Sequence, residues 1–206
     1  MPQSRRYKKK KSAGKAILAW IIVLAILAAA VFVFVSVFYE DTKKKLDEMN
    51  YPRTYSTYVE KAAKDYDLDP ALIYAVIHTE SGFDPKAESG VGAKGVMQMM
   101  PSSFEWLQEQ RGCARQYTED DLFDPEICID YGSYLLKYFY DYYGTERSAI
   151  TAYNAGFVVS DWLNDTNYSS DGKNLDSIPY PETENYVDKV ESAKEMYIKL
   201  YYSQSN

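Results

Sequence analysis

The longest apolar run in the chain covers residues 16–39 and contains no charged side chain. Folded as a helix it would extend about 36 Å, slightly more than the ~30 Å hydrocarbon core of a bilayer. It is too long for the apolar part of a secretory signal, and Glu40 follows its last aromatic residues without the small residues of a cleavage site. The pattern therefore predicts an uncleaved transmembrane helix, preceded by a tail over residues 1–15 and followed by a stalk over residues 40–54. A cleaved signal is the alternative.

Beyond the stalk, apolar residues recur at helical spacing and no strand alternation is sustained. Asp69-Pro70 and Asp124-Pro125 are typical helix starts, because Asp can cap a helix and Pro suits its first position. These signals predict an all-α domain over residues 55–202. Its expected helices cover residues 55–66, 70–80, 102–110, 125–143, 146–154 and 182–201, and its main loops cover residues 89–95 and 164–181.

Charge is distributed unevenly between the two ends of the chain. Residues 1–39 carry seven Lys or Arg and no acid, which leaves 16 basic and 30 acidic residues, a formal charge of −14, for the remainder. So acidic a domain repels phosphate backbones, and nucleic acid is not expected as a partner. Basic residues ahead of the apolar run predict a cytoplasmic N-terminus and an extracytoplasmic domain.

The chain has two cysteines, Cys113 and Cys128, both in the part expected outside the membrane. Export permits oxidation, and a disulfide between them could stabilise the domain by roughly 3 kcal/mol. Two unpaired buried thiols are the alternative. Together with the single His78 they do not form a recognisable ligand spacing, so neither a metal nor an organic cofactor is expected.

Glu80 stands out as a candidate acid. It follows Val76 by four positions and Ile77 by three, which places it on the apolar face of the helix expected over residues 70–80. It also stands at the end of that helix, where desolvation and the helix dipole both disfavour the anion and predict a raised pKa. A carboxyl that keeps its proton near neutral pH can act as the general acid that cleaves a glycosidic bond. A solvated Glu at a frayed helix end, or one paired with a basic group, is the alternative.

Four motifs, in order along the chain, carry a family resemblance. They are Ala71-Leu72-Ile73 with Glu80-Ser81, Gly92-Ala93-x-Gly95-Val96-Met97-Gln98-x-Met100-Pro101, Ala152-Tyr153-Asn154-Ala155-Gly156, and Glu182-Thr183-x-x-Tyr186-Val187. Over roughly residues 56–200 the chain resembles the lytic transglycosylases of the soluble (SLT) type, relatives of goose-type lysozyme in glycoside hydrolase family 23, which cut peptidoglycan. The resemblance implies a helical, lysozyme-like fold.

The resemblance also implies the chemistry. Glu80 would be the sole catalytic acid and base, protonating the oxygen between N-acetylmuramic acid and N-acetylglucosamine. It would then take the proton of the muramic acid C6 hydroxyl, which closes onto C1 to give a 1,6-anhydro sugar without consuming water. The substrate's own N-acetyl group is implied to stabilise the charge at C1, where ordinary glycosidases use a second carboxylate. Asp84, Glu88 and Glu105 stay open as partners.

Substrate contacts follow from the resemblance position by position. The residues that match are Ser89, Gln98 and Met100 in the groove, and Tyr153, Asn154 and Glu182 near the acid, with Tyr153 orienting Glu80. Each has a structural alternative: Met100 as core, Gln98 as a partner of the loop backbone, Glu182 as a cap of the last helix.

Two positions depart from the family pattern. Val96 replaces the usual Leu, and Cys128 replaces a frequent Asn, exchanging a hydrogen bond for the possible link to Cys113. Tyrosines crowd the helix expected over residues 125–143, where helix packing is the default interpretation and stacking on sugar rings the alternative.

The sequence thus predicts a single-pass, membrane-anchored lytic transglycosylase that acts on peptidoglycan strands and contacts the bilayer through residues 16–39. Two alternatives remain: a hydrolytic muramidase, and a non-catalytic glycan-binding scaffold of an envelope assembly.

Overall fold

The computed structural model describes the backbone of residues 6–203 and the side chains of residues 14–203. The chain divides into two units, and the boundary falls between Asn50 and Tyr51. Each unit is described by itself.

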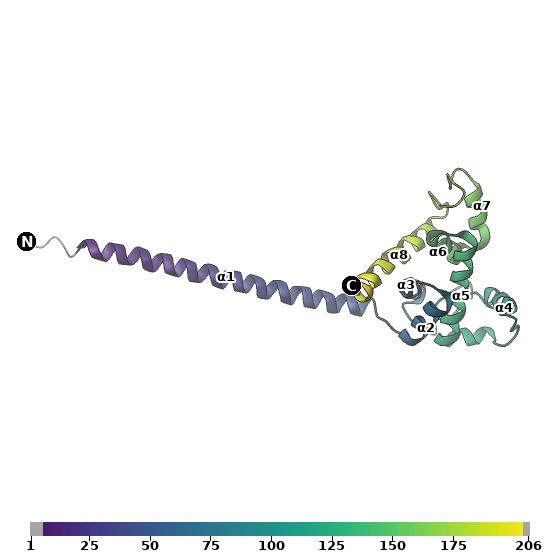
Figure 1. Cartoon of the computed structure of the whole chain (residues 1–206). Helices are drawn as coiled ribbons and strands as arrows, with labels where there is room; N and C mark the ends of the chain where they lie inside the picture. Colours follow the sequence, from purple (N-terminus) through teal and green to yellow (C-terminus); the bar gives the residue numbers. More distant parts are fainter. Residues whose placement is uncertain (1–5, 204–206) are drawn as a thin grey trace, which may run out of the picture. The chain divides into compact units, whose positions relative to one another are not determined.

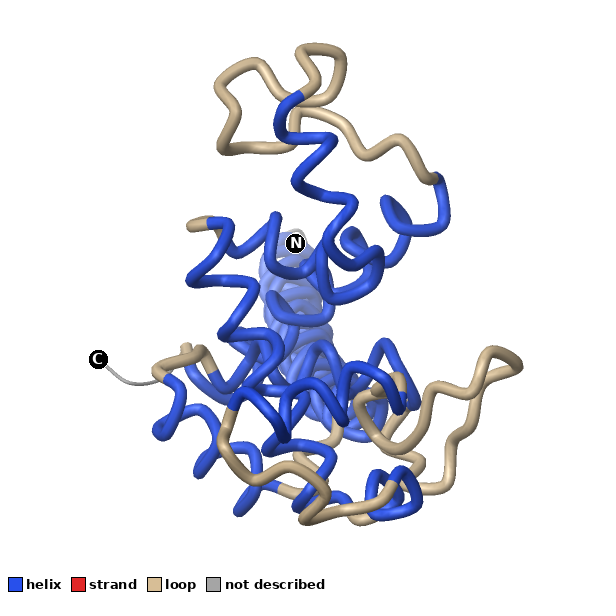
Figure 2. Tube along the Cα trace, turned by 90° about the vertical axis from the view of Figure 1, so that its right-hand side faces the viewer, coloured by secondary structure: helices blue, strands red, loops and turns tan. Residues whose placement is uncertain are grey.

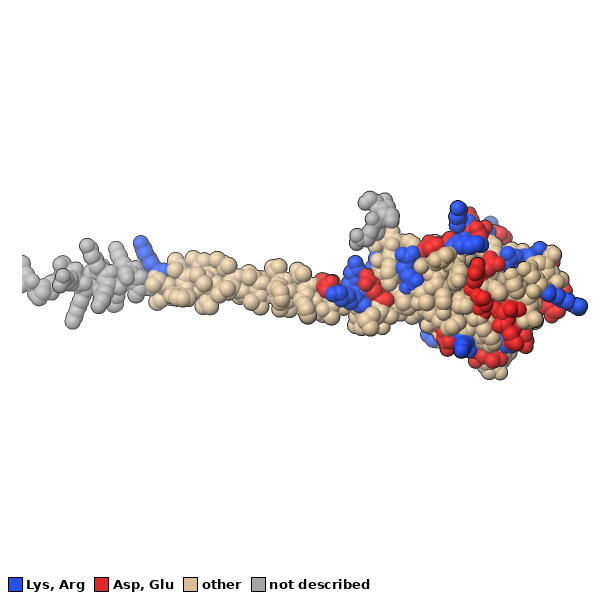
Figure 3. All heavy atoms as spheres, turned by 90° about the horizontal axis from the view of Figure 1, so that it is seen from below, with Lys and Arg blue, Asp and Glu red and all other residues tan. Residues whose placement is uncertain are grey.

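The first unit is a single helix, α1 (Arg6–Asn50), which continues without a break through the apolar run and the charged residues after it (Figure 1). In the space-filling view the apolar run is a stretch of the helix without charged side chains (Figure 3). From Gly14 to Asn50 this helix is long and apolar enough to cross a membrane. The expected stalk is therefore divided. Residues 40–50 extend α1, whereas Tyr51 belongs to the second unit, where its ring stacks on His78 at 4.8 Å.

The second unit is helical, and the tube drawing of the described residues shows helices and loops with no strand (Figure 2). Its α-helices are α2 (Ser56–Tyr66), α3 (Pro70–Ser81), α4 (Pro101–Gln110), α5 (Pro125–Tyr143), α6 (Glu146–Ala155), α7 (Val159–Asn164) and α8 (Pro181–Tyr197). Shorter turns are η1 (Glu119–Phe123), η2 (Gly156–Val158) and the π-helical η3 (Ile198–Tyr202). The predicted all-α class is confirmed. The short α7 and η1 were not predicted, because one or two turns give no periodicity to detect.

The helix ends follow the local chemistry of the sequence. The Asp69 side chain accepts a hydrogen bond from Ala71 N at 2.9 Å and so caps α3, with Pro70 at its first position. Asp124 caps α5 in the same way. Gly82 and Gly144 close these two helices with positive φ angles of 59° and 76°, a conformation that costs glycine little.

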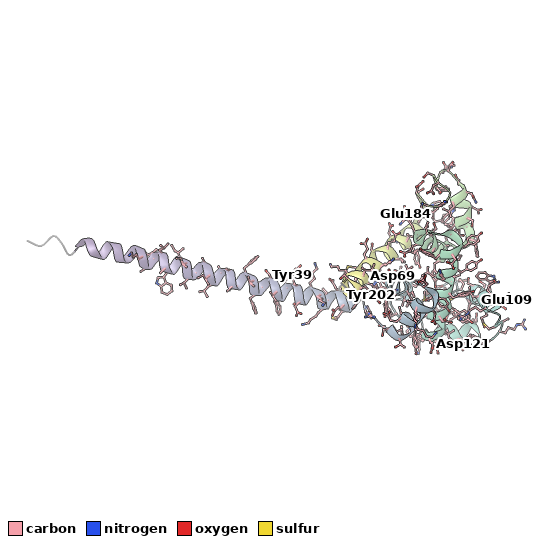
Figure 4. The ribbon with its side chains drawn as sticks, in the orientation of Figure 1. Tyr39, Asp69, Glu109, Asp121, Glu184 and Tyr202 are labelled. Carbon is pink, nitrogen blue, oxygen red and sulfur yellow. The ribbon has the colours of Figure 1, made fainter. Side chains whose placement is uncertain are left out.

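Helix α3 forms the centre of the core. The sequence predicted one buried face, but every residue from Ala71 to Ile77 is buried, so neighbours surround this part of the helix. Helix α8 covers one side, where the rings of Tyr74 and Tyr197 stack at 5.1 Å. Lys194 of α8 also reaches Asp69 at the start of α3, at 3.2 Å; Asp69 is labelled in Figure 4. A helix enclosed in this way presents its last turn at a fixed place.

The loop between α3 and α4 is shaped by its own backbone. Antiparallel bridges join Lys94 to Glu88 and to Met99, which folds residues 88–99 back on themselves. Gly95 has a φ of 74°, and a Cβ there would lie 2.0 Å from the Leu122 carbonyl oxygen. Only glycine fits at this point. The second long loop joins α7 to α8 and forms the large excursion beyond α7 in Figure 2.

Of the two possibilities left open for the cysteines, the structure has the unpaired thiols, and no disulfide joins Cys113 to Cys128. Cys113 lies on the loop after α4, and its sulfur is 3.3 Å from the hydroxyl oxygen of Tyr131 on α5. Cys128 is fully buried in α5, and its sulfur accepts a hydrogen bond from Met97 N at 3.4 Å. The two thiols therefore have separate partners.

Candidate active site

Glu80 lies in the last turn of α3, beside the loop that leads to α4. The neighbouring Ser81 hydroxyl donates to the Val96 carbonyl oxygen at 2.8 Å, which ties the helix end to that loop. Burial raises the pKa of the Glu80 carboxyl to about 7, and an interaction with the Tyr186 hydroxyl lowers it by a smaller amount. The carboxyl therefore holds a proton up to about neutral pH, as a general acid for glycosidic cleavage must.

Two tyrosines lie within electrostatic reach of Glu80. Burial and the Glu80 charge raise the pKa of both Tyr153 and Tyr186 well above the usual value, so both keep their phenolic protons. Tyr153 donates its proton to the Met97 carbonyl oxygen at 2.9 Å. The expected role of Tyr153 in orienting Glu80 stays a prediction, and it cannot rest on a hydrogen bond donated to the carboxyl. A hydroxyl has one proton to donate, and here the loop backbone accepts it.

Tyr186 is the residue placed to act on Glu80. Its hydroxyl is buried without a well-formed hydrogen bond among the described residues, yet it faces the carboxyl closely enough to lower the pKa of Glu80. In the sequence, Tyr186 is noticeable only as part of the last family motif, and no role was expected for it. A signal was present: with Thr183, Val187 and Val190 it lies at helical spacing on the buried face of α8.

Ser89 and Gln98 organise the loop beside the acid. The Gln98 amide donates to the carbonyl oxygens of Ala87 and Gly95, each at 3.0 Å. Ser89 accepts a hydrogen bond from Ala93 N at 3.0 Å. Gln98 is thus a partner of the loop backbone, as its structural alternative predicts. Contacts of Gln98 and Ser89 with a sugar would come in addition to these bonds.

The other predicted contacts lie at the surface. Met100 is 38% exposed at the residue that precedes α4, so it is not part of the core. Asn154, at the end of α6, accepts a hydrogen bond from the Thr183 hydroxyl at 2.8 Å, which brings it to the first turn of α8. Glu182 is exposed in that same turn of α8. There its negative charge interacts favourably with the positive end of the helix dipole.

Cys128, the residue that departs from the frequent Asn of the family pattern, is buried in the core. Its sulfur bonds to the loop backbone at Met97 N, and burial raises the pKa of the thiol to about 12. The Glu80 charge also raises this pKa, which places the thiol near the acid. Cys128 is therefore a neutral support of the loop.

Among the described carboxyls, Glu80 alone has a clearly raised pKa. The three acids considered as partners, Asp84, Glu88 and Glu105, are all exposed. Within the described residues no cluster of three or more His, Cys, Asp or Glu could hold a metal ion. The arrangement suits proton transfer through one partly buried acid.

Comparison with known proteins gives consistent matches to one family. Residues 57–175 match the Transglycosylase SLT domain. The chain is 32% identical to the soluble lytic murein transglycosylase of Salmonella typhimurium over 146 residues, covering 69% of this chain and 23% of the relative. It is 30% identical over 170 residues to the membrane-bound lytic murein transglycosylase C of Actinobacillus succinogenes, covering 72% of this chain and 48% of the relative.

Among solved structures, the 70 kDa soluble lytic transglycosylase of Escherichia coli superposes with a TM-score of 0.68 at 26% identity. The match covers 76% of this chain and 26% of that one. The chain thus spans about a quarter of the length of the soluble relatives it matches.

Proposed function

Because the chain belongs to the transglycosylase SLT family and has its helical, lysozyme-like fold, we propose that it is a peptidoglycan lytic transglycosylase. The substrate is the bond between N-acetylmuramic acid and N-acetylglucosamine, and the product ends in 1,6-anhydro-muramic acid. The observation that carries the proposal is the partly buried Glu80 carboxyl at the end of α3, whose pKa of about 7 keeps it protonated where the reaction needs an acid.

Glu80 serves the two halves of the reaction in turn. It first gives its proton to the glycosidic oxygen as the bond from that oxygen to C1 breaks. The resulting carboxylate then takes the proton of the C6 hydroxyl as the C6 oxygen bonds to C1. Glu80 ends protonated and no water is consumed, so one titratable group suffices.

The surrounding side chains support this cycle in distinct ways. Tyr186 donates toward the carboxylate when it forms, because the interaction of its hydroxyl with Glu80 favours the anion. Tyr153 and Cys128 hold the loop at Met97 in place. The proposed substrate contacts are Ser89, Gln98 and Met100 on the loop before α4, Asn154 at the end of α6, and Glu182 at the start of α8.

The test is product identification by mass spectrometry after digestion of purified cell wall with the full chain. We expect anhydro-muramic acid ends, and we expect Glu80→Gln to lower turnover by about a thousandfold or more, since the amide has no proton to transfer. Glu109→Gln is the matched control, because Glu109 is an exposed acid on α4 without a proposed role, and its loss should leave the reaction unchanged.

Other products distinguish the alternatives. Reducing muramic acid ends indicate a hydrolytic muramidase. Binding of glycan without turnover in the unmodified protein indicates a scaffold.

The proposal includes the membrane. Residues 16–39 of α1 cross the bilayer once, with residues 1–15 in the cytoplasm, residues 40–54 as the connection and the catalytic domain of residues 55–202 on the outer side. The length and composition of α1 support the span, and the basic residues before it support the orientation.

A further inference from the structure

Four aromatic side chains from three elements meet at one surface, which we call the aromatic platform: Trp106, Tyr138, Tyr142 and Phe157. Phe157 of η2 contacts Trp106 of α4 edge-on, with ring centroids 6.2 Å apart. The same Phe157 ring lies edge-on to Tyr138 and Tyr142 of α5, at 6.2 and 6.0 Å. Trp106 and Tyr138 meet at 5.0 Å.

Core packing does not account for this cluster. The Phe157 ring is 49% exposed and Tyr142 is 58% exposed, although both are aromatic and in contact with other rings. By contrast Tyr131, on the same helix α5, is buried, as the packing interpretation of these tyrosines predicts. The platform therefore exposes the rings of Phe157 and Tyr142 to solvent, next to the partly buried rings of Trp106 and Tyr138.

Two chain connections place the platform next to the proposed active site. Phe157 follows Asn154 by three residues, which limits their Cα separation to about 10 Å. Trp106 lies six residues along α4 from Met100, a rise of about 9 Å. The same two segments are also joined by the hydrogen bond from Tyr153 to the Met97 carbonyl oxygen, and the Glu80 charge acts on this tyrosine. The loop before α4 and the end of α6 are thus joined at this bond and joined again at the platform.

We propose that the aromatic platform is a sugar-binding subsite that stacks a ring of the glycan strand away from the bond being cleaved. This inference rests on the proposed function and names a part of the substrate surface. The rings of a β-linked glycan present faces of C–H bonds, and such faces pack on aromatic rings while the hydroxyl groups stay hydrated. A platform of uncharged aromatic side chains, a few residues along the chain from Asn154 and Met100, fits this occupant. A lipid or a protein would have no reason to continue from Asn154 and Met100.

The subsite predicts a dependence on strand length. In Phe157→Ala the KM for long glycan strands should rise about three- to tenfold, with kcat and the activity on a tetrasaccharide unchanged, because only long strands reach the platform. Phe157→Trp should restore the KM. Tyr140→Ala is the matched control, since Tyr140 is an exposed tyrosine on α5 whose ring contacts Lys137 outside the platform.

Binding of long strands to full chains carrying Glu80→Gln, with and without Phe157→Ala, separates this inference from the proposed function. Weaker binding in the double variant than in Glu80→Gln alone supports the platform. If the unmodified protein showed no turnover, the proposed function would be contradicted, but this binding result would still support the platform. Equal KM and Kd for Phe157→Ala and Tyr140→Ala overturn the platform and leave the proposed function standing. An equal loss on the tetrasaccharide also overturns it, because the side chain would then act on the reacting sugars or on the fold.

Discussion

At the scale of single residues, the chemistry of Glu80 follows from where its helix ends. A carboxyl in water is ionised at neutral pH, and the burial of this one shifts its pKa to about 7. The opposing interaction with Tyr186 keeps the shift within the range in which the group can both give and regain a proton. The two effects together set the pH at which the acid is available.

This balance predicts a pH shift in Tyr186→Phe. The hydroxyl lowers the pKa of Glu80, so its removal raises that pKa. Since turnover needs protonated Glu80, activity falls as the pH rises through the pKa, and the fall should move upward by about half to one pH unit. The pH profile of kcat measures it. Tyr197→Phe is the control, because that hydroxyl bonds to the Pro52 carbonyl oxygen. An unmoved profile with a lower rate would mean that Tyr186 only supports the fold.

At the scale of elements, the loop between α3 and α4 depends on one glycine more than on the others. Gly95 and Gly92 both have positive φ, but a Cβ at Gly95 would meet the Leu122 carbonyl oxygen at 2.0 Å, whereas one at Gly92 meets nothing within 4 Å. Gly92→Ala should therefore lower the free energy of unfolding by about 1 kcal/mol, from backbone strain alone. Gly95→Ala adds a steric clash and should lower it by about 3 kcal/mol or more. Urea unfolding of both variants provides the measurement, and equal losses would contradict the structure.

The elements also show how far local signals reach. Helices α3 and α5 were predicted nearly to their ends, because Asp caps, Pro at the first position and closing glycines all act within a few residues. The place of Glu80 followed from helical spacing in the same way. The partner of Tyr153 and the separate environments of Cys113 and Cys128 depend on contacts between segments distant in sequence. No local pattern encodes them, so the sequence left the state of the two thiols open and did not identify the hydrogen-bond acceptor of Tyr153.

At the scale of the whole molecule, the proposed orientation predicts which thiols a membrane-impermeant maleimide reaches in intact cells. Cys113 is partly exposed and should react, whereas burial raises the pKa of the Cys128 thiol and leaves it unreactive. In a Cys113→Ser background, Lys15→Cys should react only after lysis. Labelling of Lys15→Cys in intact cells of this Cys113→Ser background would indicate the opposite orientation.

With that anchor, the helical state of residues 40–50 limits how far from the bilayer the domain can work. As a helix these residues rise about 17 Å, whereas the same residues fully extended reach about 37 Å. If residues 16–39 lie in the bilayer as proposed, this helical stretch holds the start of the second unit at Tyr51 at a more nearly constant distance from the bilayer than an extended linker would. For the proposed peptidoglycan-cleaving domain, the length of this helical stretch would then decide which glycan strands are near enough to the membrane to be cut.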